Sequence, residues 1–171
     1  LYKLLGPNTG GLTQGEYLYV HTGADYEKLK DALEQGGFVR DMFSFNFFAH
    51  RMGLPAHVHA GKYRITRGMS NYRIIRLLHS GAQTHVKLVI NKVRTKSDLA
   101  RLLANNLEPD STAFYTLLCD TDYLSQFGFD TNTVVAAVMP DTYDFLWNTT
   151  ADKTFRRLRS RYVKFWNDER K

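Results

Sequence analysis

The chain has 171 residues, which is enough for one larger domain or two small ones with a buried core. Hydrophobic residues make up 43% and charged residues 23%, a balance that excludes an intrinsically disordered chain. The 23 basic and 17 acidic side chains give a formal charge of +6, so polyanions would be attracted at short range. The single cysteine, Cys119, excludes an internal disulfide. No apolar run is long enough for a membrane span, so we expect this chain to be soluble.

The first third of the chain predicts the order strand, helix, helix, strand. Residues 1–15 are rich in glycine and favour irregular backbone, so we expect a linker there. A strand is predicted over residues 16–21 and a second one over residues 61–65. Asp25 is a helix cap, and a second helix over residues 41–51 carries so many phenylalanines that we expect it to be largely buried.

The middle of the chain repeats one plan of strand end, short turn, cap and amphipathic helix. Ser70 caps the next helix, the clearest strand covers residues 85–90, and Thr95 opens another helix with Asp98 in a capping-box position. We read a degenerate internal repeat in the segments HTGADYEKLKDAL, ITRGMSNYRIIRLL and INKVRTKSDLARLL. After Pro109, short helices are predicted over residues 113–118, 123–127 and 133–139. The pattern places a domain boundary near residues 83–92.

The most distinctive string is VMPDTYDFLWNT, residues 138–149. Its proline removes a backbone donor and must end the preceding helix. Asp141 and Thr142 can form hydrogen bonds to a ligand, and the aromatic residues Tyr143, Phe145 and Trp147 have flat faces that can stack on sugar rings. The same string can also be a turn with an aromatic core anchor, and the residue types alone favour that interpretation.

Three segments, in the same order along the chain, resemble the YceG/MltG family of endolytic murein transglycosylases. They are HAGKYRITRGMSNYRIIRLLHSG (59–81), VKLVINKVRTKSDLARLL (86–103) and the tetrapeptide PDTY (140–143). The resemblance covers nearly the whole chain from about Glu16. We expect an α+β fold: a LysM-like strand-helix-helix-strand unit, a second strand-helix unit and a mostly helical C-terminal part. The expected domains are a linker after a missing membrane anchor (1–15), a LysM-like glycan-binding subdomain (16–85) and a truncated N-terminal part of the catalytic domain (86–171).

The resemblance implies an enzyme that cuts nascent peptidoglycan between N-acetylmuramic acid and N-acetylglucosamine and leaves 1,6-anhydro ends. In such chemistry one carboxylic acid protonates the glycosidic oxygen and then takes the proton of the muramoyl 6-hydroxyl, which closes the ring. That acid must stay protonated, which calls for a glutamate in a partly desolvated pocket. No glutamate here fits by its position in the pattern: Glu16, Glu27, Glu34, Glu108 and Glu169. We therefore expect the family's catalytic glutamate beyond this chain, and this fragment to be inactive alone.

The resemblance also implies candidate site residues, partners and location. Asp141, Thr142 and Tyr143 are expected to line or support the catalytic cleft, and Tyr63, Met69 and Asn71 to contact glycan in the LysM-like region. No metal or cofactor is implied, and although an older family label is aminodeoxychorismate lyase, nothing resembles a pyridoxal-phosphate site. The implied partners are peptidoglycan strands, wall-synthesis proteins and the membrane, through an anchor. The implied location is the cell envelope, on the extracytoplasmic face of the bacterial inner membrane.

Other interpretations of the same residues stay open. The chain can be a non-catalytic peptidoglycan-binding module. It can also bind single-stranded nucleic acid through its basic and aromatic residues, although neither the basic nor the aromatic residues are concentrated on one predicted surface. His57 and His59 lie on one side of an extended segment and could hold a metal, but no third ligand is evident. The last helix carries many arginines, which form a solvated face or a polyanion-binding patch.

Overall fold

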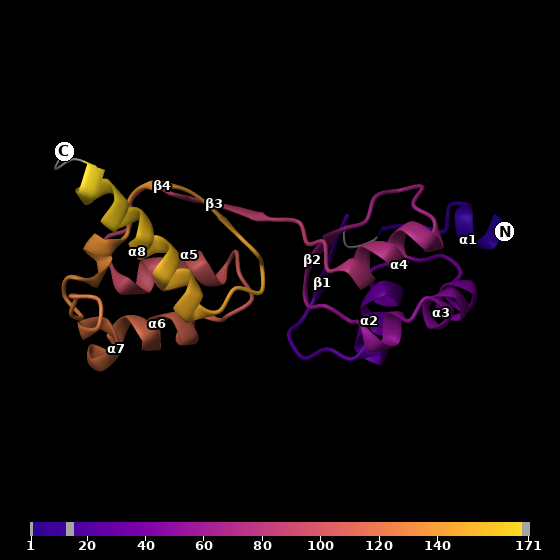
Figure 1. Ribbon diagram of the computed structural model, residues 1–171, viewed down its shortest axis with the longest axis horizontal. Helices are drawn as coiled ribbons and strands as arrows, with labels where there is room; N and C mark the ends of the chain where they lie inside the picture. Colours follow the sequence, from indigo (N-terminus) through magenta and orange to yellow (C-terminus); the bar gives the residue numbers. More distant parts are fainter. Residues whose placement is uncertain (1, 13–15, 169–171) are drawn as a thin grey trace. The chain divides into compact units, whose positions relative to one another are not determined.

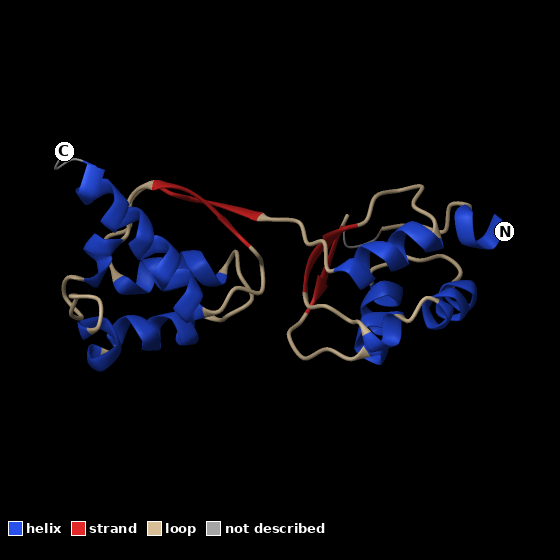
Figure 2. Cartoon of the chain, in the orientation of Figure 1, coloured by secondary structure: helices blue, strands red, loops and turns tan. Residues whose placement is uncertain are grey.

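The computed structural model describes residues 2–12 and 16–168. The chain divides into two compact units, residues 1–84 and 85–171, each with its own hydrophobic core. The described residues form eight α-helices and two antiparallel sheets of two strands each (Figures 1 and 2). The predicted α+β class is therefore confirmed. Within those same residues, no helix is both long and apolar enough to cross a lipid bilayer.

The first unit is built around the antiparallel pair β1 and β2, in which Leu18 lies opposite Tyr63 and Val20 opposite Gly61. Leu18 and Val20 are buried, while the alternate residues Tyr17 and Tyr19 are exposed, as the two-residue period of a strand requires. Helices α2 and α3 lie between the two strands along the chain, so the predicted order strand, helix, helix, strand is confirmed. The elements are α1 (Tyr2–Leu5), β1 (Tyr17–Val20), α2 (Tyr26–Gln35), α3 (Met42–Arg51), the 3₁₀ turn η1 (Leu54–Ala56), β2 (Gly61–Arg64) and α4 (Asn71–Ser80).

The opening segment is packed against the first unit, in contrast to the irregular linker that its composition predicts. Residues Tyr2–Leu5 form the short helix α1. The Asn8 side chain is 7% exposed and donates hydrogen bonds to Asn71 Oδ1 at 2.6 Å and to the Asp41 carbonyl at 3.1 Å. These buried polar contacts, which composition does not reveal, hold the segment in place. Residues 1 and 13–15 of the expected linker lie outside the described residues.

Helix α3 has one buried face and one exposed face. Phe45 and Ala49, four residues apart, are fully buried, whereas Phe43 and Phe47 are 83% and 59% exposed. Because a helix turns every 3.6 residues, each of these pairs shares one side of the helix. The expectation that the helix is largely buried is therefore wrong for Phe43 and Phe47.

The second unit is held by the antiparallel pair β3 and β4, in which Val86 lies opposite Phe145 and Ile90 opposite Asp141. Strand β4 covers residues for which the sequence predicts a turn or a ligand-facing segment. The C-terminal part is mostly helical, as predicted, but it contributes this additional strand to the sheet. The elements are β3 (Val86–Ile90), α5 (Lys96–Ala104), α6 (Ser111–Cys119), α7 (Thr121–Ser125), the 3₁₀ turn η2 (Val134–Ala137), β4 (Asp141–Phe145) and α8 (Ala151–Asp168).

The repeated plan of strand, cap and helix is confirmed at three places. Asp25, Ser70 and Thr95 precede α2, α4 and α5, and each side chain accepts a hydrogen bond from the backbone N–H three residues later. The three distances are 2.9, 3.3 and 3.1 Å. Each cap pairs a backbone N–H that the first turn of its helix leaves without a partner, so it fixes where the helix begins.

Candidate functional site

A polar hollow of about 320 Å³ lies between β4 and the middle of α8. Arg157, Arg161 and Lys164 are four and three residues apart and therefore share one face of α8. Phe155 and Leu158, on another face of this helix, are buried in the core. Their burial fixes the rotation of the helix about its axis and therefore the direction of its basic face. The residues that line the hollow are Asp141, Thr142, Tyr143, Asp144, Arg157, Ser160, Arg161 and Lys164.

Asp141 is held in this hollow as a charged carboxylate. Its Oδ1 accepts the Thr142 N–H at 2.8 Å, and its Oδ2 accepts from Nε of Arg161 at 2.5 Å. The backbone hydrogen bond from Thr142, and then Arg161, hold the pKa of Asp141 below its usual range. A carboxyl group that is ionised at neutral pH can orient a ligand but cannot donate a proton to a glycosidic oxygen. Asp141 therefore suits a supporting role and not that of the catalytic acid.

The aromatic side chains of this segment belong to the core. Tyr143 is 5% exposed, and its hydroxyl donates to the Met139 carbonyl at 2.7 Å. Burial raises the pKa of Tyr143. Phe145 and Trp147 are also buried, so the three rings act as the core anchor that the residue types alone favoured. Of the predicted cleft residues, Thr142 is exposed and Asp141 partly exposed.

Two of the three predicted glycan-contact residues in the first unit are buried in its core. Tyr63 has no exposed surface, its hydroxyl donates to the His59 carbonyl at 2.8 Å, and burial raises its pKa to about 12. Asn71 is equally buried and donates to the Lys3 carbonyl at 2.7 Å. Both side chains stabilise the fold and offer no surface to a glycan. Met69 remains partly exposed.

A second hollow, of about 470 Å³, adjoins the first and shares Asp144 and Arg157 with it. Lys153 lines this hollow one helical turn before Arg157, so α8 presents a stripe of four cations: Lys153, Arg157, Arg161 and Lys164. This stripe places four of the chain's basic side chains beside β4, together with Asp141 and Asp144. It can attract the acidic groups of a ligand, as the alternative of a polyanion-binding patch on this helix requires.

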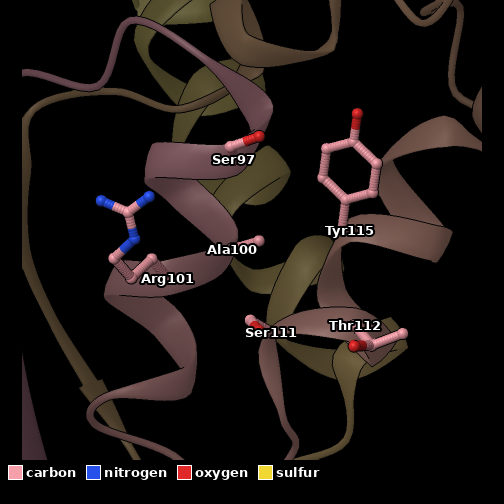
Figure 3. Close-up of a pocket in the computed structure, with 6 residues that line it drawn as sticks. All are labelled: Ser97, Ala100, Arg101, Ser111, Thr112 and Tyr115. Carbon is pink, nitrogen blue, oxygen red and sulfur yellow. The ribbon is translucent and has the colours of Figure 1, made fainter.

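A third hollow, of about 330 Å³, lies between α5 and α6 in the second unit. It is lined by Ser97, Ala100, Arg101, Ser111, Thr112 and Tyr115. Figure 3 shows Ser97 and Ala100 on α5 facing the side of α6 that carries Tyr115. These residues carry no signal in the sequence, because small hydroxyl-bearing residues on two helices form no motif along the chain.

Comparison with known proteins identifies the family. A model of the YceG-like family matches residues 18–171. The chain belongs to the YceG-like family. A crystal structure of a yceG-like protein from Listeria monocytogenes is similar, with a TM-score of 0.44 and 16% identity, over 90% of this chain and 57% of that one. The chain thus spans little more than half of the Listeria protein. No curated protein matches.

None of the glutamates that the structure describes in this YceG-like chain is buried. Glu16 and Glu27 form exposed ion pairs with basic side chains at 3.1 and 2.9 Å. Glu34 is exposed and Glu108 partly exposed. None therefore lies in a desolvated pocket of the kind expected for the catalytic acid. Glu169 lies outside the described residues.

The described histidines of the first unit do not form a metal site. The ring of His57 lies 4.6 Å from that of His79, and its Nδ1 is 3.0 Å from the Gly53 carbonyl oxygen. Over residues 2–12 and 16–168, no group of three or more histidine, cysteine, aspartate or glutamate side chains could hold a metal ion. His57 is thus engaged with its neighbours in the fold.

Proposed function

We propose that this YceG-like chain belongs to a lytic transglycosylase that cleaves nascent peptidoglycan strands between N-acetylmuramic acid and N-acetylglucosamine. The observation that carries the proposal is the family match over residues 18–171, which covers most of the first unit and all of the second. The products are glycan strands that end in 1,6-anhydro-N-acetylmuramic acid. The protein acts in the cell envelope, at the extracytoplasmic face of the bacterial inner membrane, together with wall-synthesis proteins.

The two units have different tasks in this proposal. The order β1, α2, α3, β2 of the first unit supports a LysM-like role in holding a glycan strand. The second unit lines part of the cleft through Asp141 and Thr142, both of which face the polar hollow beside α8. Asp141 is fixed there by Arg161, so a ligand meets a positioned carboxylate and an exposed threonine hydroxyl.

The catalytic acid comes from outside the described residues in this proposal. The reaction needs one group that first protonates the leaving oxygen and then accepts the 6-hydroxyl proton. The pKa of Asp141 is lowered, and no described glutamate is buried, so neither type of side chain supplies that group. Because the 6-hydroxyl of the sugar is itself the nucleophile, the second carboxylate of ordinary glycosidases is not required.

The test is to incubate purified peptidoglycan sacculi with the full-length product of the gene and to identify anhydro ends by mass spectrometry. We expect Asp141→Ala to lower their release about tenfold, as loss of a positioning group does, with little change in melting temperature. The matched control is Asp31→Ala, since Asp31 is an exposed aspartate on α2. Absence of anhydro ends with the full-length protein would refute the proposal.

The alternative function is a non-catalytic glycan-binding module, which the strand-helix-helix-strand order of the first unit also favours. The same experiment separates the two. Full-length protein that sediments with sacculi and releases no anhydro ends is the binding module. Release of anhydro ends by residues 1–168 alone would instead show that our placement of the catalytic acid is wrong.

A further inference from the structure

The hollow between α5 and α6 has a wall and a base suited to the face of a sugar ring. On one side stands the ring of Tyr115, which is 43% exposed although its neighbour Phe114 is buried. The base includes Ala100, which is buried at 2% exposure and leaves room beside the ring. The volume of about 330 Å³ lies at the lower end of the range of roughly 300–1,000 Å³ that is typical of small-molecule sites. Figure 3 shows the Tyr115 ring beside this opening.

The remaining lining is polar. Ser97, Ser111 and Thr112 each carry a hydroxyl that can donate and accept, and Arg101 adds a guanidinium that can only donate. All four residues are at least partly exposed. A sugar hydroxyl both donates and accepts, so three hydroxyls and one donor group match a neutral polyhydroxylated ring better than a multiply charged anion. The aromatic wall provides the apolar contact that the C–H face of a pyranose needs.

The hollow is held in shape by the caps of both helices. Thr95 Oγ1 accepts the Asp98 N–H at 3.1 Å, which fixes the first turn of α5 around Ser97. Asp110 Oδ1 accepts the Ala113 N–H at 2.8 Å, which fixes the first turn of α6, where Ser111 and Thr112 lie. The opposite sides of both helices are anchored by buried core residues. A site on such rigid elements loses little entropy when it binds a ligand.

We propose that the hollow between α5 and α6 binds one pyranose residue of a neutral glycan, stacked on Tyr115 and hydrogen-bonded to Ser97, Ser111, Thr112 and Arg101. This site is separate from the residues beside β4 that the proposed reaction uses. It stands on its own geometry and does not depend on that reaction. A protein that handles glycan strands would gain from it a second point of contact, which keeps the strand in place.

The experiment is titration of the chain with chitotetraose, followed by NMR chemical shifts and by calorimetry. We expect shifts in α5 and α6, and for Tyr115→Ala at least about tenfold weaker binding, because the stacking contact and its buried area are lost. Tyr115→Trp keeps an aromatic wall and should retain binding within about threefold. The matched control is Tyr72→Ala, which removes an exposed tyrosine, 37% accessible, from α4. Melting curves of each variant establish that it folds.

Several outcomes would overturn the assignment. They are unchanged affinity of Tyr115→Ala, shifts confined to the first unit, or no binding of chitotetraose to the chain. Displacement of the sugar by sodium sulfate at constant ionic strength would instead identify an anion site built on Arg101 and the start of α6. None of these results bears on whether the full-length protein makes anhydro ends, so failure of this inference and failure of the proposed reaction are distinguishable.

Discussion

Replacing Asn71 by alanine should destabilise the first unit by about 2–3 kcal/mol. The buried Asn71 side chain donates to the Lys3 carbonyl at 2.7 Å and to Ser44 Oγ at 3.1 Å, and it accepts from Asn8 Nδ2 at 2.6 Å. A buried donor or acceptor left without its partner costs about 1–3 kcal/mol. Asn8 keeps the Asp41 carbonyl as a second partner at 3.1 Å, and Lys3 lies near solvent, so the lower part of that range applies to each group.

The two units can be followed separately during unfolding. Both tryptophans, Trp147 and Trp166, belong to the second unit, so tryptophan fluorescence reports that unit alone. Hydrogen exchange of the amides in α2 and α4 reports the first unit. For a unit of this size, about 2 kcal/mol lowers the melting temperature by roughly 8–16 °C. In Asn71→Ala we expect this loss in the first unit and an unchanged fluorescence transition.

The control for this prediction is Arg73→Ala, an exposed position on the same helix, which should change stability by less than about 0.5 kcal/mol. An Asn71→Ala variant that is as stable as this control and has lost affinity for glycan would contradict the prediction. Asn71 would then be a ligand contact, as the resemblance to the family first implied.

Two further predictions concern charge and packing. The hydrogen bond from the Tyr123 hydroxyl lowers the pKa of Asp152, and Arg156 lowers it further. The carboxylate therefore stabilises the fold above about pH 4, and this stabilisation is lost as the pH falls through the pKa of Asp152 in the folded state. Tyr123→Phe should therefore be less stable than the wild type at pH 7, and the difference should shrink below about pH 4 in urea titrations; a difference independent of pH would contradict this. Phe45→Ala should cost about 3–5 kcal/mol because the ring is fully buried, whereas Phe43→Ser, 83% exposed, should cost less than about 0.5 kcal/mol in the same thermal assay.

Sequence predicted the features that depend on nearby residues. A helix cap is a contact between residues three apart, so Asp25, Ser70 and Thr95 could be recognised from spacing alone. Strand β4 was missed, although Tyr143, Phe145 and Trp147 alternate with polar or exposed residues in the two-residue period of a strand. Pro140 and the resemblance to the family drew the interpretation toward a turn and a ligand contact.

The candidate site was predicted less well, because burial depends on the tertiary fold. Tyr63 and Asn71 are residue types that often contact sugars, yet both lie in the core of the first unit. Asp141, which is predicted to line or support a glycan cleft, lies in a polar hollow, and its ion pair with Arg161 joins positions on β4 and α8. Pairings over such a separation have no local signature in one sequence.

The pairing of β3 with β4 also governs when the second unit can form. Residues 91–140 lie between the two strands, so β3 has no partner until the ribosome has released residue 145. During that interval the apolar segment VKLVI has an open edge to which another strand could add. Pairing two strands that are so far apart in the chain also slows folding, because the segment between them loses conformational entropy before the contacts between the strands form. Synthesis of this protein thus has a vulnerable stage that ends only when β4 emerges.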